Sequence, residues 1–551
     1  MENMKNYLKN NAPLILLIFI SVFSFTPLLR SGYFPMHDDQ QAVRLLEMDK
    51  CINDLQIPCR WTPDLGYGFG YPQFNYYGPL PYYAMEVVHK VVGFGFLDSV
   101  KVGFIIGFLI AAIGMYKLGA SMWGKWGGFL SGLIYTFIPY HAVDVYVRGA
   151  MGEFWALSFL PFIFWSILEI SRGNKKHVLW LSLSFASLIL CHNITTFIFS
   201  PAILVWILYL YNKNLKKMIY PIVGLVWGFC LSASFVIPAF IEKNFVHIET
   251  LTQGYFNYLA HFVTIKQLLF SSYWGYGTSE LGPFDNISFA VGILVWTLPI
   301  LAIILSIFLK RKEYRSLLII TALGWIYLFF THQKSTFLWN NIPLLSFVQF
   351  PWRFLGITVF LFSLTAGSIV SFVNKKNAVW LFLVITILTI LLNKSFFRPK
   401  DWISLTDTEK FTGDNWNFQV TSSIFDYLPI YAKHPPTFPA PDKLIIVDGK
   451  SSSQLLAKGT DWQKWSLDVS SDQSTVRLPI FDFPNWQVMV DNIKTSINHN
   501  NELGLIEFSV VAGKHSIYAV LKNTPVRVVS NIISVLAFIL IPFFMLKSKK
   551  I

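Results

Sequence analysis

The chain has 551 residues, of which 54% are hydrophobic and 14% are charged. Soluble domains contain about 25% charged residues, so this composition excludes an ordinary soluble protein. The 44 Lys and Arg outnumber the 31 Asp and Glu, which gives a net charge of +13. These basic residues stand between apolar runs and form no continuous patch, which argues against a nucleic-acid partner. Four cysteines without a Cys-x-x-Cys pair exclude a disulfide scaffold and a zinc site.

Apolar runs long enough to cross a bilayer recur along the chain. A transmembrane helix needs about 20 apolar residues, within a range of roughly 17 to 25. The first run is predicted to be a retained helix, because no small-residue cleavage pattern follows it. We therefore predict an α-helical polytopic membrane protein with twelve spans, at 12–29, 100–118, 123–141, 154–170, 177–192, 196–211, 218–240, 289–309, 316–331, 354–373, 378–393 and 527–546.

Lys and Arg residues assign the sides of the membrane. Nineteen of them lie in or beside alternate short connections and the two termini. Cytoplasmic loops carry an excess of Lys and Arg, so both termini are predicted to be cytoplasmic in a multi-pass protein of the cell membrane. The outer side then holds the four longer segments 30–99, 241–288, 332–353 and 394–526.

The last outer segment has a different pattern from the rest of the chain. Short alternating stretches predict strands at 443–447, 465–469, 475–478, 486–490 and 516–520, separated by Asp-Gly, Pro-Asn and Ala-Gly-Lys turn signals. We expect three parts: a transmembrane domain over 1–393 with outer loops 30–99, 241–288 and 332–353; a β-sandwich-like outer domain over 394–526; and a final transmembrane helix with a basic cytoplasmic tail over 527–551.

The first outer loop carries His37, Asp38 and Asp39 at the start of a predicted helix. Carboxylates at such a position often cap the helix, and this alternative stays open for either aspartate. The same environment keeps a carboxylate ionised and fixed, as a general base or a metal ligand requires. Asp38 and Asp39 are therefore catalytic candidates, and His37 is a neighbouring site candidate.

Charged residues recur at the outer ends of other predicted spans. Asp144 and Arg148 are spaced as an intrahelical ion pair, while a guanidinium at this depth also suits phosphate. Pro351 favours a first helical turn, which places Arg353 near the anion-attracting end of a helix. The candidates for phosphate binding are Arg148, Arg353, His192 and Arg60, and the other site candidates are Glu153, Glu242 and Lys243.

A set of short motifs carries a family resemblance: 37–38, 60–61, 68–80, 146–153, 192–193, 349–353 and 426–429. There the chain resembles the multi-pass membrane proteins named for a 6-pyruvoyl-tetrahydropterin synthase related domain and, at greater distance, YfhO-like proteins. That family is similar to the GT-C class of membrane glycosyltransferases. The resemblance implies transfer of a sugar from a polyprenyl-phosphate donor to an outer-face acceptor with inversion. A carboxylate, Asp38 or Asp39, would take the acceptor proton, and basic groups would stabilise the departing phosphate.

Two other classes of function stay open. A transporter or lipid flippase would place ionisable residues near the bilayer midplane, on helices broken by Gly or Pro. A non-enzymatic cell-envelope assembly protein would use the β-rich segment to hold a partner. The sugar, the acceptor (glycan, lipid or protein) and any divalent metal are left open by the sequence. So is a disulfide between Cys51 and Cys59, which an outer location allows.

Overall fold

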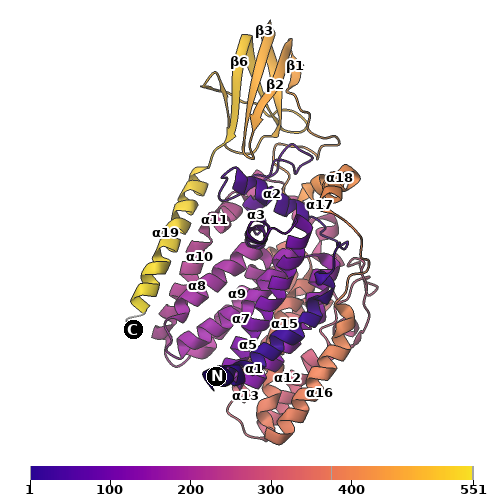
Figure 1. Ribbon diagram of the computed structural model, residues 1–551, viewed down its shortest axis with the longest axis vertical. Helices are drawn as coiled ribbons and strands as arrows, with labels where there is room; N and C mark the ends of the chain where they lie inside the picture. Colours follow the sequence, from indigo (N-terminus) through magenta and orange to yellow (C-terminus); the bar gives the residue numbers. More distant parts are fainter. Residues whose placement is uncertain (1, 374, 549–551) are drawn as a thin grey trace.

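The computed structural model describes residues 2–373 and 375–548. A bundle of helices forms the body of the molecule, both termini lie toward one end of it, and a β-sheet projects from the other end (Figure 1). Lys549 and Lys550 of the predicted basic tail lie outside the described residues. The helices are α1 (Glu2–Phe25), α2 (Gln41–Asn53), α3 (Gln73–Tyr76), α4 (Leu80–Val87), α5 (Phe96–Thr136), α6 (Pro139–Ala142), α7 (Met151–Ser171), α8 (His177–Cys191), α9 (Asn193–Tyr211), α10 (Ile219–Leu231), α11 (Ala233–Ile241), α12 (Ile293–Phe308), α13 (Tyr314–Phe330), α14 (Thr336–Asn341), α15 (Leu355–Ala366), α16 (Lys375–Asn393), α17 (Asp407–Lys410), α18 (Gly413–Thr421) and α19 (Pro525–Ser548).

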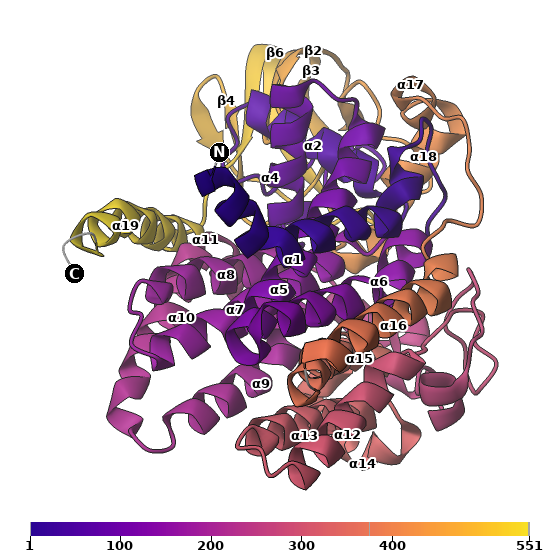
Figure 2. The same cartoon turned by 60° about the horizontal axis from the view of Figure 1, so that its bottom comes forward.

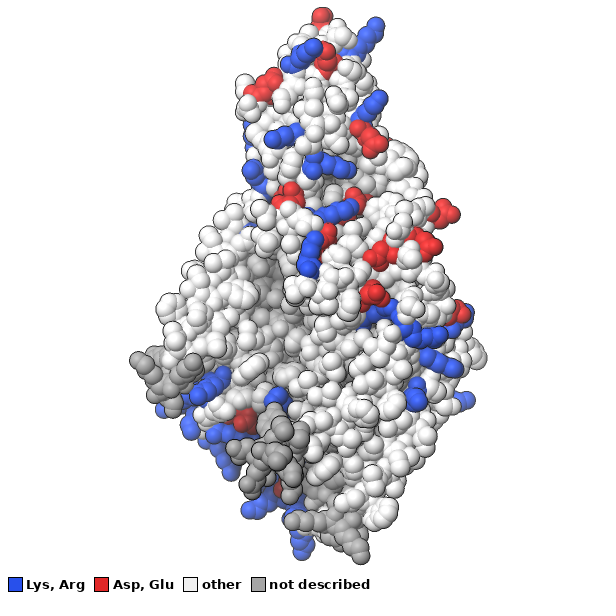
Figure 3. Space-filling model, viewed as in Figure 1, with Lys and Arg blue, Asp and Glu red and all other residues white. Residues whose placement is uncertain are grey.

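The described residues contain seven helices long and apolar enough to cross a membrane, or up to nine if each bent pair is one span. One bent pair, 215–231 with 233–241, turns by 74°, and the other, 314–330 with 333–341, turns by 90°. The predicted span 218–240 is therefore bent and not straight. The chain is a membrane protein. On the face in Figure 3 the charged side chains gather over the top and the right edge and again at the lower left, and the broad oblique band between the two groups is almost free of them. A hydrocarbon layer requires such a band, because ionised groups are costly inside it.

Helix α5 folds back on itself at Gly124, whose φ of 79° and ψ of 169° interrupt the helix. A Cβ added to Gly132 would lie 3.2 Å from the carbonyl oxygen of Ala112. In a straight helix these two residues would be about 30 Å apart. The two halves of α5 therefore run antiparallel. They overlap the predicted spans 100–118 and 123–141, although the second half ends at Thr136.

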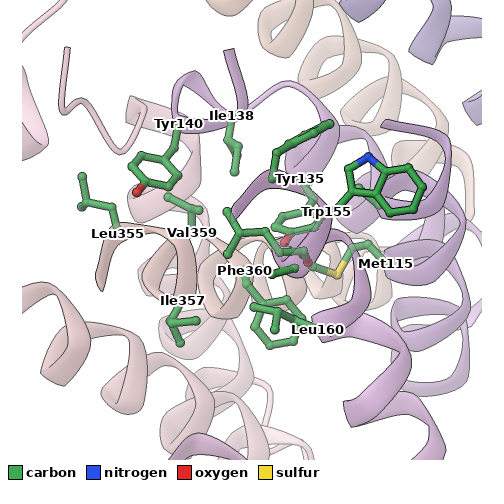
Figure 4. Close-up of a cluster of buried hydrophobic side chains, with 14 of the residues drawn as sticks. Met115, Tyr135, Ile138, Tyr140, Trp155, Leu160, Leu355, Ile357, Val359 and Phe360 are labelled. Atoms are coloured by element: carbon green, nitrogen blue, oxygen red, sulfur yellow. Dashed lines mark hydrogen bonds between the residues drawn. The ribbon is translucent and has the colours of Figure 1, made fainter. Parts of the chain in front are cut away.

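The core of the bundle lies between α5, α7 and α15. In the view from the lower end, α8 and α10 lie on one side of α5, and α12, α13 and α16 lie on the other (Figure 2). Buried side chains from α5, α7 and α15 meet in the close-up of Figure 4, including Met115, Tyr135, Trp155, Leu160 and Phe360. The polar atoms among them are satisfied: Tyr135 Oη donates to the Leu157 carbonyl at 2.8 Å, and Trp155 Nε1 donates to the Gly103 carbonyl at 2.9 Å.

The sheet has six antiparallel strands: β1 (Ile445–Asp448), β2 (Ser451–Lys458), β3 (Trp462–Phe481), β4 (Trp486–Val490), β5 (Ile493–Thr495) and β6 (Leu505–Leu521). Their order is β1-β3-β6-β4-β5, and β2 also pairs with β3. The predicted strand 486–490 is β4. The predicted strands 465–469 and 475–478 are two parts of the single strand β3, and Ala512-Gly513-Lys514 lies inside β6 instead of forming a turn.

A single sheet thus replaces the predicted sandwich-like pair of sheets. The reason is that β3 and β6 stay paired across an irregularity between Val469 and Gln473, so the chain continues where a turn was expected. The segment 30–99, predicted to be the first outer loop, packs against the base of this sheet. Phe481 N donates to the Phe69 carbonyl at 3.0 Å, and Trp61 packs edge-on to Trp486. Cys51 and Cys59 of the same loop form a disulfide.

Candidate active site

The segment that carries Asp38 is held against the connection that precedes α7. The His37 amide donates to the Val147 carbonyl at 3.0 Å, and the Asp38 amide donates to the Arg148 carbonyl at 2.8 Å. These two bonds join segments more than 100 positions apart in the sequence. They bring the predicted carboxylates and a predicted phosphate-binding arginine into one region.

Gly149 makes this close approach feasible. Its φ is +67°, and an added Cβ would lie 2.2 Å from Met36 Sδ, so a larger residue would meet both strain and a clash. Its carbonyl accepts a hydrogen bond from Gln41 Nε2 at 2.8 Å. The same Gln41 nitrogen lies 3.0 Å from Asp38 Oδ2, which ties the helix α2 to both segments.

Asp38 forms an ion pair with Arg44 from the second turn of α2. Arg44 Nη1 donates to Asp38 Oδ2 at 2.8 Å and to Tyr77 Oη at 3.2 Å. The Arg44 side chain is 3% exposed, whereas that of Asp38 is 32% exposed. In this pair Asp38 is therefore accessible, whereas Arg44 is buried. Capping does not explain it, because the N-cap residue of α2 is Gln40 and no side chain caps this helix.

Asp39 has different partners from its neighbour. Its Oδ2 accepts from Lys410 Nζ at 2.8 Å, and its carbonyl accepts from Gln419 Nε2 at 2.6 Å. Burial raises the pKa of Asp39, against the opposing effect of Lys410. These contacts fasten the segment 30–99 to α17 and α18, so Asp39 has a structural role in this arrangement.

Arg148 and Glu153 form a buried cluster with Asp144 and Tyr140. Arg148 Nη1 donates to Asp144 Oδ1 at 2.5 Å, and Nη2 donates to Glu153 Oε2 at 2.8 Å. Tyr140 Oη donates to the other Glu153 oxygen at 2.5 Å. The intrahelical pair of Asp144 and Arg148 exists, but it is one part of a wider network. The guanidinium also lies 4.5 Å from the centroid of the Trp352 ring.

Arg353 enters the same cluster from the short 3-10 helix Pro351–Phe354, which precedes α15. Its Nε lies 3.6 Å from Glu153 Oε2, beyond hydrogen-bonding distance, and its Nη1 donates to Gln349 Oε1 at 2.7 Å. Gln349 has a φ of 66° and a ψ of −52°, and the next amide, that of Phe350, donates to the Val348 carbonyl at 2.7 Å. This is a strained γ-turn. The strained residue Gln349 therefore accepts a hydrogen bond from one side of the Arg353 guanidinium group.

His192 lies beside this cluster and caps α9. Its Nδ1 accepts from the Thr195 amide at 3.3 Å. A Cβ on Gly152 would lie 2.8 Å from the Cys191 carbonyl, which places the 191–192 segment against the residues around Glu153. His37 is exposed and its Nε2 lies 3.0 Å from the Tyr276 carbonyl. Burial of part of its ring lowers the pKa of His37.

Three of the predicted site residues lie elsewhere. Arg60 and Glu242 belong to a separate buried network with Arg527 of α19. Lys243 lies over the Phe240 ring, with its Nζ 5.3 Å from the ring centroid. These three do not join Asp38, Arg148 and Arg353, because helix α3 separates the two groups: Asn75 of α3 contacts Arg60, while Tyr77 after it contacts Arg44.

Sequence reasoning missed two members of the site. Arg44 has no motif of its own, and its pairing with Asp38 depends on how α2 is placed. Asp426 belongs to the Asp-Tyr-Leu-Pro motif at 426–429, one of the motifs that carry the family resemblance, but the sequence predicted no role for it. Burial raises the pKa of Asp426 to about 6; the charge of Asp38 adds to this rise, and Arg44 opposes it. Asp426 therefore brings a second carboxyl group into the electrostatic range of Asp38.

The cluster offers carboxylates and guanidinium groups and no ready-made metal centre. Among residues 2–373 and 375–548, no three His, Cys, Asp or Glu side chains are grouped as a metal ion would need. An ionised carboxylate next to buried guanidinium groups can accept a proton and hold an anion.

Comparisons with solved structures give low overall similarity. The chain is similar to the arabinofuranosyltransferase AftD from Mycobacteria, at 12% identity over 72% of this chain and 28% of that one, with a TM-score of 0.49. It is similar to the Archaeoglobus fulgidus oligosaccharyltransferase at 12% identity over 79% and 62% of the two chains, with a TM-score of 0.45. ArnT from Cupriavidus metallidurans, solved bound to undecaprenyl phosphate, gives 11% identity over 68% and 62%, with a TM-score of 0.39.

Sequence comparison identifies the family. An uncharacterized protein of Lactococcus lactis subsp. cremoris is 28% identical over 266 residues, which are 47% of this chain and 42% of that protein. The chain thus spans less than half the length of this relative. Residues 74–398 match the membrane protein family described by a 6-pyruvoyl-tetrahydropterin synthase related domain, which is more than half of the chain. The resemblance found in the sequence is confirmed, and the chain belongs to the 6-pyruvoyl-tetrahydropterin synthase related family of membrane proteins.

Proposed function

We propose that the protein is a GT-C-like membrane glycosyltransferase that moves a sugar from a polyprenyl-phosphate donor to an acceptor at the outer face. The observation that supports this is the placement of a partly exposed carboxylate, Asp38, next to a buried cluster that contains Arg148 and Arg353. Asp38 can take a proton, and the arginines of the cluster can stabilise a departing phosphate.

The proposed step is a single displacement with inversion. The acceptor hydroxyl oxygen forms a bond to the anomeric carbon of the sugar, and the bond from that carbon to the phosphate oxygen breaks. Asp38 takes the hydroxyl proton, and the electron pair leaves with the polyprenyl phosphate. Arg353 is the better phosphate ligand of the two arginines, because Arg148 already bonds two carboxylates, whereas Arg353 Nε lies 3.6 Å from the nearest carboxylate oxygen of Glu153.

The proposed topology has twelve passes, cytoplasmic termini and an outward site. It counts the two halves of α5 separately, each bent pair once, and the shorter helices α8 and α12 as spans. It keeps the three parts 1–393, 394–526 and 527–551. A single cysteine at the exposed Ser452 should react with an impermeant reagent outside intact cells, and one at the exposed Asn174 should not. The reverse pattern would overturn the topology and the outward site together.

Activity is tested by release of undecaprenyl phosphate from synthetic undecaprenyl-phosphate hexoses, with cell-envelope extract as the acceptor source. Asp38→Asn should lower the rate by roughly 10² to 10⁴, the usual loss for a catalytic base. The matched control is Asp98→Asn, which removes an aspartate whose side chain is 58% exposed and should retain the rate. If Asp38→Asn is fully active and Asp39→Asn is not, the base is Asp39; full activity in both rejects the mechanism.

Donor binding is tested separately, by native mass spectrometry with undecaprenyl phosphate. Arg353→Gln should weaken binding about tenfold or more, since a hydrogen bond to a charged group contributes about 1.5–3 kcal/mol. Arg148→Gln should also unfold more readily, because it leaves Asp144 and Glu153 buried without their partner. Unchanged binding in a folded Arg353→Gln protein would remove this residue from the donor site.

The alternatives have less support. A transporter needs ionisable groups at the bilayer midplane. The ionisable cluster described here lies on short helices next to the starts of long ones: Glu153 is in the first turn of α7, Arg148 ends the short helix before α7, and Arg353 lies in the short helix before α15. An assembly protein would retain its function in Asp38→Asn, which the activity test distinguishes.

A further inference from the structure

A group of exposed basic side chains lies where the helices α1 and α16 end. We call this group the basic patch, and its members are Arg30, Lys394, Arg398 and Lys400. The candidate membrane spans Asn11–Leu29 and Val379–Phe396 end at these residues. Figure 3 shows Lys and Arg side chains gathered at the right edge of the molecule, at the height where α1 and α16 end in Figure 1. The basic patch therefore lies toward the end of the bundle that carries the sheet.

Backbone pairing brings the two parts of the basic patch together, although they are far apart in the sequence. The Tyr33 amide donates to the Ile403 carbonyl at 3.0 Å, and the Ile403 amide donates to the Tyr33 carbonyl at 2.9 Å. Trp402 Nε1 donates to the Ser31 carbonyl at 2.6 Å, and the Arg30 guanidinium lies 5.5 Å from the centroid of the Trp402 ring. The fold itself therefore gathers these charges at one place on the surface.

The basic patch has a surplus of positive charge. Within residues 2–373 and 375–548, none of its four members forms an ion pair. The neighbouring Asp98 pairs with Lys101 at 2.7 Å, and Asp407 accepts hydrogen bonds from two backbone amides at the start of α5. Asp401 is the one acidic residue in the stretch 394–403. Four exposed cations therefore stand beside the single negative charge of Asp401.

Apolar surface begins directly beside the basic patch. The side chains at the ends of the two candidate spans include the exposed Phe23, Leu29, Leu391 and Leu392. Lys394 Nζ lies 5.3 Å from the centroid of the Phe23 ring. Hydrocarbon covers such side chains on a membrane span, and the charged lipid head groups lie next to the hydrocarbon. The basic patch is therefore at the depth of the lipid phosphate groups.

We propose that the basic patch binds the phosphate groups of anionic membrane lipids at the end of the bundle that carries the sheet. Clusters of roughly four to eight Lys and Arg beside a membrane span attract anionic lipid, and each cation near such a surface strengthens the attraction about fivefold. Lys and Arg donate charge-assisted hydrogen bonds to phosphate oxygens. This inference does not rest on the proposed glycosyl transfer, nor on which side of the membrane the sheet lies.

The basic patch is linked to the candidate active site through one tyrosine. Tyr276 Oη donates to the Arg398 carbonyl at 2.9 Å, and the Tyr276 carbonyl lies 3.0 Å from His37 Nε2. Phe397, inside the same stretch, packs against Tyr146 with the ring centroids 6.3 Å apart. Lipid bound to the basic patch therefore fixes the depth in the bilayer of the region that contains His37.

The test measures which lipid lies next to the basic patch. A bimane label is attached to Ser395→Cys, an exposed position between Lys394 and Arg398, in the full chain with Cys191→Ala and Cys230→Ala. The protein is placed in nanodiscs of dioleoylphosphatidylcholine that contain a minor fraction of dioleoylphosphatidylglycerol. A nitroxide on the chains of one lipid or the other, close to the glycerol, quenches the label. The association of phosphatidylglycerol at the label should exceed that of phosphatidylcholine about tenfold or more.

Matched variants separate the charge of the basic patch from the net charge and from the fold. The patch variant, which should bring the association of the two lipids close to equality, carries Lys394→Gln, Arg398→Gln and Lys400→Gln. The control variant loses the same charge from exposed positions of the sheet and should keep the preference for phosphatidylglycerol; it carries Lys443→Gln, Lys450→Gln and Lys514→Gln. A third variant keeps the charge and should also keep the preference; it carries Lys394→Arg, Arg398→Lys and Lys400→Arg.

Three outcomes overturn the proposal. The first is equal quenching by the two lipids in the wild type. The second is a preference that falls as far in the control variant as in the patch variant, because the effect then follows net charge and not this surface. The third is loss of the quenching by phosphatidylglycerol when a trace of unlabelled undecaprenyl phosphate is added, because the basic patch then belongs to a polyprenyl phosphate.

Discussion

Glu242 offers a sharp test of how the last helix is held. Its Oε2 accepts from Arg527 Nε at 2.8 Å, its Oε1 accepts from Thr524 Oγ1 at 2.5 Å, and it is 1% exposed. Glu242→Gln keeps the shape and removes the charge, which leaves Arg527 and Arg60 buried without a carboxylate. Removing one partner of a buried ion pair costs about 3–5 kcal/mol. The local opening equilibrium of α19 should therefore rise by roughly 10²- to 10⁴-fold.

Hydrogen exchange of peptides that cover 525–535 measures this opening directly. The matched control is Glu502→Gln, which breaks the pair of Glu502 with Lys433, whose side chains are 68% and 65% exposed. An exposed pair contributes about 0–1 kcal/mol, so this control should leave the exchange of α19 unchanged. If exchange in Glu242→Gln rises no more than in Glu502→Gln, the reasoning about the buried network is refuted.

Three further predictions concern the candidate site. Gln349→Ala removes an acceptor from Arg353 and should weaken undecaprenyl phosphate binding about tenfold in native mass spectrometry, with unchanged binding counting against a positioning role. Asp426 has a raised pKa of about 6, so its contribution to stability is present at pH below about 4 and is lost as pH rises through 6. Asp426→Asn should remove this part of the pH dependence of the unfolding temperature. An identical pH profile of the unfolding temperature in Asp426→Asn and the wild type would contradict this prediction. Gly149→Ala should cost about 1–3 kcal/mol through backbone strain and contact with Met36, and should lower the unfolding temperature more than Gly93→Ala, where φ is +82° and nothing lies within 4 Å.

The pairing of the charged residues shows how far sequence reasoning reaches. It marked Asp38 and Arg353 as lying near the starts of helices, and they lie shortly before α2 and α15. It marked Arg148 in the connection between two apolar runs, where Arg148 ends the short helix Val143–Arg148. It preferred Asp38 to Asp39 as the base by position alone and assigned no partner to either. Arg44 is six positions from Asp38, whereas Lys410 is 371 positions from Asp39. Only the packing of α17 against the segment 30–99 assigns the second partner.

The sequence by itself determined that the chain lies in a membrane, that the segment 394–526 contains strands, and which family it resembles. These are local properties: hydrophobicity summed over about 20 residues, alternation over a few residues, and short motifs. The tertiary structure alone decided that β3 continues through the expected turn and that Arg60 joins Asn531 instead of Arg148. Such contacts depend on how distant segments pack, because the energy that selects them comes from burying groups together and is absent from either segment alone.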